Sequence, residues 1–494
     1  MDRSAHHAER AAKGLLTWEP SVSLDTVRDH VVGLGVQVPL HDGTRSRYVN
    51  LDNAATTPAL QPVLDCVDRF QRDYSSVHRG SGFKSLLSTH VYRRCRQIAG
   101  AFIGADPNCH SVLFTQNATH SLNKLARRLS LRPEDVVVGT LMEHHSNILP
   151  WRFGPCRYVC ADIRRRDGTL DVADLEAKLR RHAGHLKVVS VTGGSNVTGV
   201  VPPYRRIARM AHRYGAWFVL DATQVVPRRR IAMGAPDDPE RIDFLAFSGH
   251  KMYAPFGAGV LAGRKEVFQQ GAPDVVGGGT VHAVTDEEVV WQPPPEREES
   301  GTPNLNGAVA LARAAQVLQE LGMEGVAEHE RELTRYCLRR LLDVEGLRLY
   351  GQKDPEIAVD RLGVFALDAP ALGHSLLAAV LGYEWGIGVR NGCFCAQPYV
   401  RELLGIPREQ MRRVVRKLAK GDHATVPGLV RVSLGIYNTR AEIDYLIEAL
   451  RAVLAEGPRA RYVIDPRHLD HVPEDWEVDY DDFLPFPPAP GSTW

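Results

Sequence analysis

Short apolar runs alternate with amphipathic helical patterns through the first part of the chain. The apolar runs have the length and composition of buried strands and lie at 110–115, 134–140, 186–193, 216–223, 242–251 and 257–263. Between them, the stretches 118–130 and 204–215 repeat apolar side chains at the spacing of one helix face. Because this alternation is typical of strand–helix units with parallel strands, we expect an α/β domain with its chemistry at strand ends and loops.

The pattern changes near residue 305, where the helical stretches become longer. Helices predicted at 307–323 and 325–344 lead to further strand-like runs at 348–351, 362–368 and 430–435. We therefore expect four parts: a helical arm (1–45), a large domain (46–305), a smaller C-terminal α/β domain (306–456) and a tail (457–494). The tail is acidic, aromatic and rich in proline, which predicts either disorder or an extended strap across the surface.

Composition limits the classes of function. The formal net charge of +1 over 494 residues gives no electrostatic case for binding nucleic acid or an anionic membrane. No apolar run approaches the ~18 residues that span a bilayer, and the N-terminal residues lack the apolar core of a signal peptide. The eight cysteines follow no regular framework, which indicates reduced thiols, so we expect a cytoplasmic protein.

A basic insert lies in the smaller domain near residues 400–428. It includes a predicted helix with a basic face and an opposite apolar face, the latter formed by Met411, Val414, Val415 and Leu418. Nucleic-acid binding is one interpretation of this helix, and a solvated helix beside the active site is the one that we prefer. The arginine runs at 164–166 and 228–230 are expected in exposed loops.

Two charged residues at the ends of apolar runs suggest a specific chemistry. Lys251 follows the run 242–248, and a lysine there is by itself more often a surface charge. Asp221 ends the run that begins at 216, where a lone carboxylate is costly unless a cation or hydrogen-bond donors meet it. Together they suit pyridoxal phosphate: the lysine forms the Schiff base, and the acid keeps the pyridine nitrogen protonated so that the ring accepts electrons.

The segment around the lysine, "FSGHKMYAPFGAGVL", resembles the cofactor-lysine segment of class V, fold-type I enzymes, particularly SUF-type cysteine desulfurases and selenocysteine lyases. Further segments recur in that family's order and cover residues 48 to about 450: "LDNAATTP", "VHRGSG", "EHHSNILPW", "SNVTG", "LDATQ", "SGTPN", "VRNGCFCAQP" and "VRVSLGIYNT". The resemblance implies an α/β fold-type I transferase with a large, mostly parallel sheet domain, a smaller C-terminal α/β domain, bound pyridoxal 5'-phosphate and a homodimer.

The resemblance also assigns roles around the cofactor ring. Lys251 is the Schiff-base lysine and a later proton shuttle, and Asp221 pairs with the pyridine nitrogen. Gln224 is placed to hydrogen-bond the ring hydroxyl, and His144 lies over the pyridine face. His145, its neighbour, is interpreted as an ordinary core histidine.

The phosphate is expected at the start of the helix that begins near residue 118, where free N–H groups and the helix dipole favour an anion. The family's usual glycine–threonine turn is replaced by Asn117-Ala118. The expected phosphate contacts are Ala118, Thr119, Ser248, His250 and Thr280. Thr280 belongs to a glycine loop (277–280) that is expected to reach the phosphate of a neighbouring subunit.

The substrate side needs a group that holds the carboxylate of an amino acid, which a planar guanidinium does with two hydrogen bonds. Arg431, inside an apolar strand, occupies the family's carboxylate-binding position, with Asn196 as a second contact. Arg390 and His78 match further active-site positions of the family with less defined roles.

Cys395 aligns with the nucleophile of the desulfurases, in the segment "NGCFCAQPY". It would attack the substrate sulfur as a thiolate, favoured by nearby cations, and keep that sulfur as a persulfide while the substrate becomes alanine. Cys393 gives the loop a "GCFC" sequence that is also similar to molybdenum-cofactor sulfurases, and it is either a resolving thiol or an inert packing residue. A zinc site with His144 and His145 would need further ligands, so no metal is expected.

The prediction from the sequence is a cysteine desulfurase that passes sulfur from L-cysteine to an acceptor protein. Other enzymes with the same cofactor remain alternatives: a C–S lyase, a selenocysteine lyase, an epimerase or a transaminase. The set Lys251, Asp221, Gln224 and Arg431 argues against a scaffold that has lost its chemistry.

Overall fold

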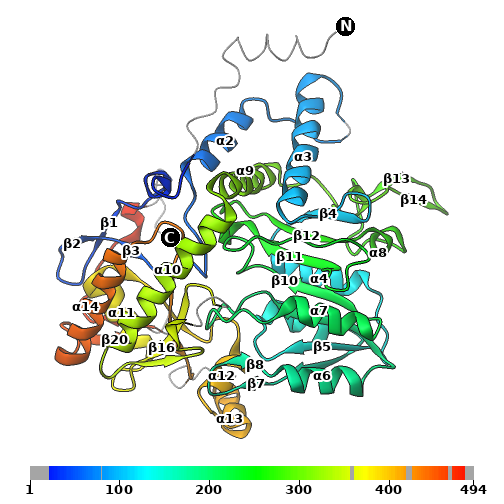
Figure 1. Ribbon diagram of the computed structural model, residues 1–494. Coiled ribbons are helices and arrows are strands. Elements are labelled where there is room, and N and C mark those ends of the chain that lie inside the picture. Colours follow the sequence, from blue (N-terminus) through cyan, green and yellow to red (C-terminus); the bar gives the residue numbers. More distant parts are fainter. Residues whose placement is uncertain are drawn as a thin grey trace.

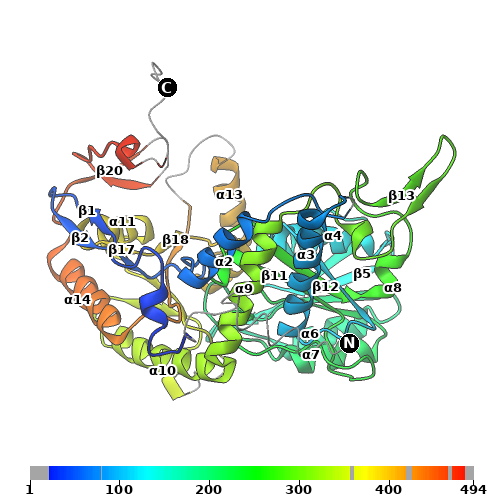
Figure 2. The ribbon, with the colours of Figure 1, turned by 90° about the horizontal axis from the view of Figure 1, so that it is seen from above.

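The computed structural model describes residues 22–78, 80–356, 361–418, 426–465, 470–483 and 485. Two α/β units lie side by side, with long helices between them (Figures 1 and 2). The larger unit holds a seven-stranded sheet of order β4-β12-β11-β10-β9-β5-β6. Its strands are β4 (His110–Thr115), β5 (Val136–Thr140), β6 (Arg157–Ala161), β9 (Leu186–Thr192), β10 (Trp217–Asp221), β11 (Phe244–Ser248) and β12 (Gly259–Arg264).

The sheet is mostly parallel, as the apolar runs predict. Strands β11, β10, β9, β5 and β6 run parallel to one another, and β12 is antiparallel to both β11 and β4. The sequence reading missed β6, which lies at the sheet edge and keeps a partly exposed burial pattern without an uninterrupted apolar run. Buried strands carry a stronger hydrophobic signal than edge strands, which explains the difference.

Helices cover both faces of the large sheet, so successive strand residues enter different cores. One core packs alternate strand residues against α6 (Val172–Arg181), α7 (Tyr204–Arg213) and α9 (Leu305–Leu321). The other packs the intervening residues, such as Leu113 and Val219, against α4 (Ala118–Arg128). On the first side, α9 also contacts α2 (Gln61–Gln71) and α3 (Phe83–Phe102).

The smaller unit has its own core around an antiparallel sheet of order β15-β16-β19-β18. These strands are β15 (Arg348–Tyr350), β16 (Val364–Asp368), β18 (Arg390–Gly392) and β19 (Leu429–Ser433). Apolar side chains of α10 (Met323–Leu342), α11 (His374–Trp385) and α14 (Arg440–Glu456) pack on it. Two short helices, α12 (Gln397–Leu403) and α13 (Arg408–Leu418), occupy the expected insert.

The described part of the N-terminal arm, residues 22–45, is less helical than expected. It holds one 3-10 helix, Val27–His30, and strand β1 (Gln37–Pro39), which pairs with β2 (Arg45–Arg47). Gly33 has a φ of +82°, a conformation that ends helical geometry. The arm lies against the smaller unit, where Arg28 forms an ion pair of 2.6 Å with Glu442 of α14. Residues 1–21 lie outside the described residues.

The described part of the tail forms a strap on the smaller unit, one of the two expected alternatives. Strand β20 (Tyr462–Ile464) pairs with β21 (His471–Pro473), and the Trp476 ring packs edge-on against Tyr383 of α11 at 4.7 Å between ring centroids. The Glu384 carboxylate accepts hydrogen bonds from the main-chain N–H groups of Arg459 and Ala460. Residues 466–469, 484 and 486–494 lie outside the described part.

The expectation of exposed loops was wrong for part of one arginine run. Arg228 and Arg229 are not solvated: both bind the buried carboxylate of Glu330 on α10, at 2.6 Å and 2.5 Å. The main-chain N–H of Gly363, before β16, donates to the same carboxylate over 2.9 Å. These contacts join the two units, because Arg228 belongs to the larger one and Glu330 and Gly363 to the smaller one.

Among the helices of the described residues, none combines the length and apolar character needed to cross a membrane. The described residues also contain no cluster of three or more His, Cys, Asp or Glu side chains placed to hold a metal ion.

Candidate active site

A cavity of about 800 Å³ lies where the two units meet. The carboxyl ends of β5, β9, β10 and β11 open into it from the large sheet, as expected for a ligand site of a parallel α/β sheet. Strands β18 and β19 contribute from the smaller unit. The lining includes most of the residues expected from the sequence: Ala118, Thr119, His144, Asn196, Asp221, Gln224, Ser248, His250, Lys251, Arg390, Cys395 and Arg431.

Lys251 is positioned by a 3-10 turn, Gly249–Lys251, directly after β11. The main-chain N–H of Gly249 donates to Ala258 O over 2.7 Å, which fixes the turn. Enclosure by the protein, and then the positive charge of Arg431, lower the pKa of the Lys251 amine to about 8, and Asp221 opposes this. The amine is therefore available in its neutral, nucleophilic form far more often than on an ordinary lysine.

Asp221 is buried at the end of β10, with only one of its carboxylate oxygens in use. Its Oδ1 accepts hydrogen bonds from the N–H and the hydroxyl of Thr223, at 3.1 Å and 2.5 Å. No described residue donates to Oδ2. Burial raises the pKa of Asp221, while the Thr223 bonds and Lys251 oppose the rise. A cationic N–H in the cavity would meet the free oxygen and relieve the cost of burying the charge.

Gln224 is held with its oxygen uncommitted. Its amide nitrogen donates to Ala54 O over 2.9 Å, and its Oε1 has no hydrogen-bond partner among the described residues. Because Gln224 lines the cavity, that oxygen can accept a hydrogen bond from a hydroxyl group there.

His144 is a neutral imidazole. Burial first, and then the charge of Lys251, lower its pKa to about 3. The main-chain N–H of Ser146 donates to His144 Nδ1 over 3.1 Å, which leaves the ring proton on Nε2. The preceding Glu143 is fully buried and accepts hydrogen bonds of 2.6 Å from both Thr140 and Asn147, so the segment that carries His144 is rigid.

The start of α4 provides an anion cup. Ser248 Oγ accepts the N–H of Ala118 over 2.8 Å, and the N–H of Thr119 has no acceptor in the described part of the chain. Thr119 and Ser146 share a hydrogen bond of 2.7 Å between their hydroxyls. Strand β12 passes close beneath this turn: a Cβ on Gly259 would lie 2.6 Å from Asn117 Cα. Asn117 caps the helix by accepting the N–H of His120, so the free N–H of Thr119 and the helix dipole are what α4 offers to an anion, without a glycine at position 118.

His250 lines the same end of the cavity, in the turn that carries Lys251. Burial and then Lys251 lower the pKa of its imidazole to about 4, so it is neutral near pH 7. Its ring Nδ1 lies 3.3 Å from the hydroxyl of Thr56, and its carbonyl oxygen accepts the N–H of Thr57 over 2.9 Å.

Arg431 is held by a residue that the sequence reading missed. Its Nη2 donates to Asp52 Oδ1 over 2.7 Å, and its Nη1 donates to Asn196 O over 3.1 Å. Its Nε is buried without a hydrogen-bond partner among the described residues. Arg390 Nε reaches the other oxygen of Asp52 at 3.3 Å. Asp52 therefore orients both arginines, and both line the cavity, where their guanidinium groups can meet an anionic ligand.

The cysteine loop is held in an uncommon conformation. Phe394 and Cys395 have φ values of 52° and 54°, in the left-handed region that costs a non-glycine residue ~1–2 kcal/mol. The amide nitrogen of Asn196 donates to Phe394 O over 2.7 Å, and the Arg431 guanidinium lies 5.0 Å from the centre of the Phe394 ring. Cys395 is exposed, whereas Cys393 is partly buried and burial raises the pKa of its thiol.

His145 has more contacts with this loop than an ordinary core histidine would need. Its main-chain N–H donates to Cys395 O over 2.6 Å, and its ring Nε2 accepts the N–H of Gln397 over 3.2 Å. No periodic pattern of side chains predicts this contact. The only hint was that His145 shares the matched segment "EHHSNILPW" with His144.

Two expected site residues lie outside the cavity of a single chain. His78 has a φ of 70° and its ring lies 5.9 Å from that of Tyr92. Thr280 is buried and its hydroxyl donates to Gly277 O over 2.7 Å. Their expected roles remain predictions.

Comparison with known proteins gives the family. Residues 49–446 match the family model "Aminotransferase class-V". The chain therefore belongs to the class V aminotransferase family and has its fold-type I architecture, as the motifs predicted. A cysteine desulfurase from Haloferax volcanii is 32% identical over 87% of this chain and 97% of its own length. A probable cysteine desulfurase from Streptomyces coelicolor is 34% identical over 84% and 93%.

Solved structures agree with this assignment. The apo structure of a cysteine desulfurase from Thermococcus onnurineus NA1 superposes with a TM-score of 0.73, at 28% identity, over 89% of this chain and 100% of that chain. A cysteine desulfurase from Escherichia coli gives a TM-score of 0.71, at 26% identity, over 88% and 99%.

Proposed function

We propose that the protein is a pyridoxal-phosphate-dependent cysteine desulfurase that converts L-cysteine to L-alanine and keeps the sulfur as a persulfide on Cys395. The observation that carries this proposal is that Lys251, Arg431 and Cys395 line one cavity. A lysine of lowered pKa, a guanidinium with a free donor and an exposed thiol are the three groups that this reaction needs. The cysteine desulfurases among its relatives support the same reaction.

The cavity fits pyridoxal 5'-phosphate. Lys251 would hold its aldehyde carbon, Asp221 Oδ2 its ring nitrogen and Gln224 Oε1 its ring hydroxyl. The phosphate group would take the donors at the start of α4, those of Thr119 and Ser248 among them. When bound, this cofactor supplies an electron sink beside the substrate Cα.

The chain's own residues then bind and orient the substrate. The Arg431 guanidinium, which lines the cavity, meets the carboxylate of L-cysteine, with Asp52 fixing its plane. Lys251 moves the proton at the substrate Cα, for which a pKa of about 8 suits both uptake and release near neutral pH. His144 presents Nε2–H as a hydrogen-bond donor and carries no charge that would repel Lys251.

The sulfur step conserves atoms and electrons. The Cys395 thiolate attacks the substrate Sγ, the new Sγ–Sγ bond forms, and the Cβ–Sγ bond breaks with its electron pair left on the carbon side. A proton then adds to Cβ, which completes L-alanine, while Cys395 carries the transferred sulfur as a persulfide. The exposure of Cys395 leaves that sulfur within reach of an acceptor thiol.

The proposal includes a homodimer. Apolar side chains are exposed on α3 at Phe83 and Leu86, with 76% and 63% of their surface accessible, and on the loop and hairpin near Thr280, at Val276 and Val290. That hairpin, β13 (Val281–Val284) with β14 (Val289–Trp291), projects from the larger unit (Figure 1). Large exposed apolar groups in such a pattern mark an interaction surface, and a partner's loop would bring Thr280 toward the phosphate.

The eight cysteines are all free thiols, which supports a reducing cytoplasmic setting.

The experiment that tests the function is incubation of the purified protein with pyridoxal phosphate, L-cysteine and a reductant, with alanine and sulfide measured together. Equal amounts of both, lost in Cys395→Ala and in Lys251→Ala, would support the proposal. Sulfide with pyruvate would identify a C–S lyase instead, and turnover that survives in Lys251→Ala would contradict the cofactor site.

A further inference from the structure

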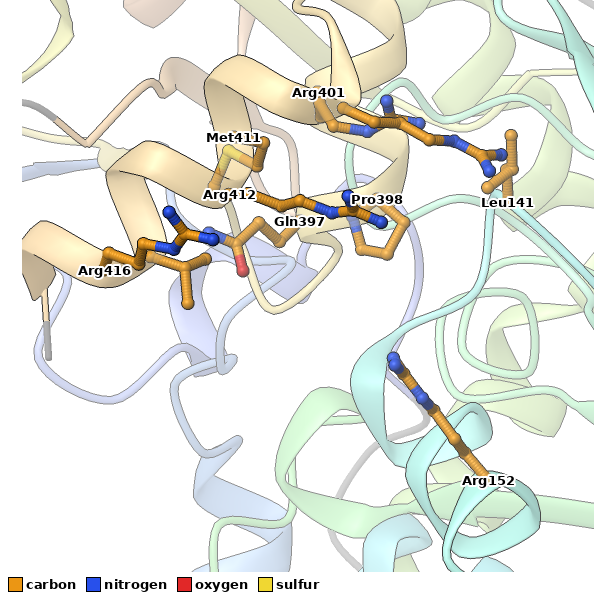
Figure 3. A pocket seen from close by; sticks show the side chains of 10 residues that line it. Leu141, Arg152, Gln397, Pro398, Arg401, Met411, Arg412 and Arg416 are labelled. Carbon is orange, nitrogen blue, oxygen red and sulfur yellow. The ribbon is translucent and has the colours of Figure 1, made fainter.

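A second cavity, of about 590 Å³, lies beside the cysteine loop and is formed largely by the insert. We call it the arginine groove. It is lined by Leu141, Arg152, Gln397, Pro398, Arg401, Arg408, Met411, Arg412, Val415 and Arg416. Figure 3 shows arginines from α12 and α13 on one side and Arg152, from α5 (Leu149–Arg152), on the other.

The floor of the groove is apolar because of how α13 packs. Met411 and Val414 are buried at 9% and 8% exposure, whereas Val415 on the same helix keeps 49% of its surface exposed. Together with the half-buried Pro398, Val415 offers an accessible apolar surface inside a ring of cations. Most side chains of the basic helix are exposed, and Val415 leaves part of its apolar face exposed as well.

The rim has an excess of positive charge. Arg401 forms an ion pair of 2.6 Å with Glu402, and Arg412 a looser one of 3.6 Å with Glu409. Arg152, Arg408 and Arg416 have no carboxylate partner among the described residues, and all three are exposed. Exposed cations of one sign around a concave apolar floor attract an anionic partner that also carries apolar side chains.

The chain's own acidic tail is not that partner. Every Asp and Glu of the tail falls within the described residues, since the segments 466–469 and 484–494 contain neither residue type. The described tail packs on α11 and on the N-terminal strands, where Trp476 meets Tyr383 and the Phe483 ring lies 5.9 Å from the Arg45 guanidinium. Strand β20 and helix α13 lie apart in both ribbon views (Figures 1 and 2).

Nucleic acid fits the groove less well than an acidic protein segment does. None of the described residues that line the groove is aromatic, so they provide no platform on which unpaired bases stack. An amphipathic helix, in contrast, can place its apolar face on Val415 and Pro398 and its carboxylates on the arginine rim. Arg–carboxylate pairs with two hydrogen bonds would set its register.

The groove is continuous with the site of chemistry. Gln397 and Pro398 line it and begin α12, two and three positions after Cys395. Arg152 ends α5, which follows the segment of His144 and His145. A protein docked here would therefore have its surface beside the exposed thiol of Cys395.

We propose that the arginine groove docks an acidic amphipathic helix of the protein that accepts sulfur from Cys395. The inference rests on the proposed desulfurase function and adds the chemistry of the partner. In the transfer, a thiolate of the acceptor attacks the outer sulfur of the Cys395 persulfide, a new S–S bond forms on the acceptor, and Cys395 leaves as a thiolate. The groove raises the local concentration of the acceptor thiol and takes no part in turnover with small thiols.

The test uses the full-length holoenzyme and a synthetic peptide about 15 residues long, with glutamates on one helical face, leucines on the other and one terminal cysteine. Binding is followed by fluorescence anisotropy, and sulfur transfer to the peptide by mass spectrometry after L-cysteine is added. The groove variant is Arg412→Glu with Arg416→Glu. The matched control is Arg180→Glu with Arg181→Glu on α6, where two arginines are equally exposed and far along the chain.

We expect the groove variant to bind the peptide at least about tenfold more weakly and to transfer sulfur to it correspondingly slowly, while the control binds like the original protein. Val415→Lys, which keeps the positive charge but removes the apolar floor, should also weaken binding. Alanine production driven by dithiothreitol should be unchanged in all three, which shows that the fold and the active site are intact.

An equal loss of peptide affinity in the groove variant and the control variant would indicate nonspecific charge attraction and would overturn the proposal. Peptide affinity that is unchanged in Val415→Lys would also overturn it. A third contrary result would be tight binding of a single-stranded RNA oligonucleotide that is lost in the groove variant and retained in Val415→Lys. If the original protein forms no alanine with dithiothreitol, the desulfurase function itself fails. The anisotropy comparison would then show separately whether the groove binds acidic helices.

Discussion

The main-chain N–H of His145 lies 2.6 Å from the carbonyl oxygen of Cys395 and donates a hydrogen bond to it. The His145 ring adds a second contact, in which its Nε2 accepts the N–H of Gln397. The loop between these contacts holds Cys395 in a left-handed conformation that would otherwise relax. The two histidines thus have different positions: His144 lines the cavity proposed for the cofactor, and His145 holds the loop of the proposed nucleophile, Cys395.

His145→Ala should slow persulfide formation with little loss of bound cofactor. Leaving the partly buried N–H of Gln397 without an acceptor costs ~1–3 kcal/mol, which corresponds to about 5- to 150-fold in rate if the loop is correctly placed only part of the time. Single-turnover measurement of alanine with L-cysteine gives the rate, and absorbance gives the cofactor content. His145→Gln places an oxygen near the position of Nε2 and should restore most of the rate. Equal rates in both variants would contradict a positioning role.

The two cysteines of the loop should differ in function. Cys395→Ala should keep the cofactor and lose persulfide formation, because the exposed thiol that reaches the substrate is gone. Cys393→Ala should retain much of the activity, since burial raises the pKa of that thiol and keeps it protonated. Mass spectrometry of the protein after brief exposure to L-cysteine locates the persulfide. A persulfide on Cys393 would reverse the assignment.

Cofactor uptake should depend on the titration of Lys251. Its pKa is lowered from 10.5 to about 8, so near pH 7 the neutral amine is about 300-fold more abundant than on an ordinary lysine. Because only the neutral amine bonds to the aldehyde, the uptake rate should rise with pH up to about 8 and level off above it. Stopped-flow absorbance of the apoprotein with pyridoxal phosphate measures the profile.

Arg431 provides a control for that profile. Its charge is the second cause of the lowered pKa after burial, so Arg431→Gln should move the midpoint to higher pH. Arg390 also pairs with Asp52 but is not among the causes of the shift, and Arg390→Gln should leave the midpoint near 8. A midpoint near 10.5 in the original protein would mean that the amine is not enclosed as the structure shows.

Arg431→Lys should raise KM for L-cysteine by about 10- to 100-fold, because an ammonium cannot hold Asp52, Asn196 O and a substrate carboxylate in one plane. Arg390→Lys should change KM by less than about threefold, since the Arg390 side chain is 55% exposed and its pair with Asp52 is screened. Steady-state assays with alanine detection compare the two. Similar effects of the two substitutions would show that the carboxylate binds elsewhere.

The proposed homodimer gives a prediction of mass in solution. Light scattering during size-exclusion chromatography should report twice the chain mass of 54.7 kDa. Phe83→Glu with Leu86→Glu should shift the protein toward the monomer, because carboxylates would replace the exposed apolar groups on α3. Tyr480→Glu, at an equally exposed position on the tail, is the control. A monomeric original protein would remove the expected role of Thr280.

The sequence predicted the large sheet well and its irregular surroundings poorly. Strand β4 has the bounds expected from its apolar run, because each of its residues is buried and periodicity reports burial. Edge strand β6 was missed because most of its residues are partly exposed, so it has no uninterrupted apolar run. The basic run at 228–230 was wrongly predicted to be fully exposed. Charge alone does not show that two of its arginines pair with Glu330, which is distant along the chain.

The candidate site shows the same limit. Lys251 and Asp221 could be found because each lies at the end of an apolar strand, where burying a charge is costly without a compensating partner. Asp52 and His145 could not, because their partners lie 379 and 252 positions away along the chain and only the fold brings them together. The motif match supplied the cavity's other residues as a set, without the hydrogen bonds that hold them.

The buried carboxylate of Glu330 has a consequence for how substrate enters. It binds Arg228, Arg229 and the N–H of Gly363 at once, and separating such a buried pair costs ~3–5 kcal/mol. At that cost, hinge opening of the two units would be populated in less than about one molecule in a hundred. An amino acid therefore enters while the two units stay joined, through the side of the cavity where Cys395 is exposed.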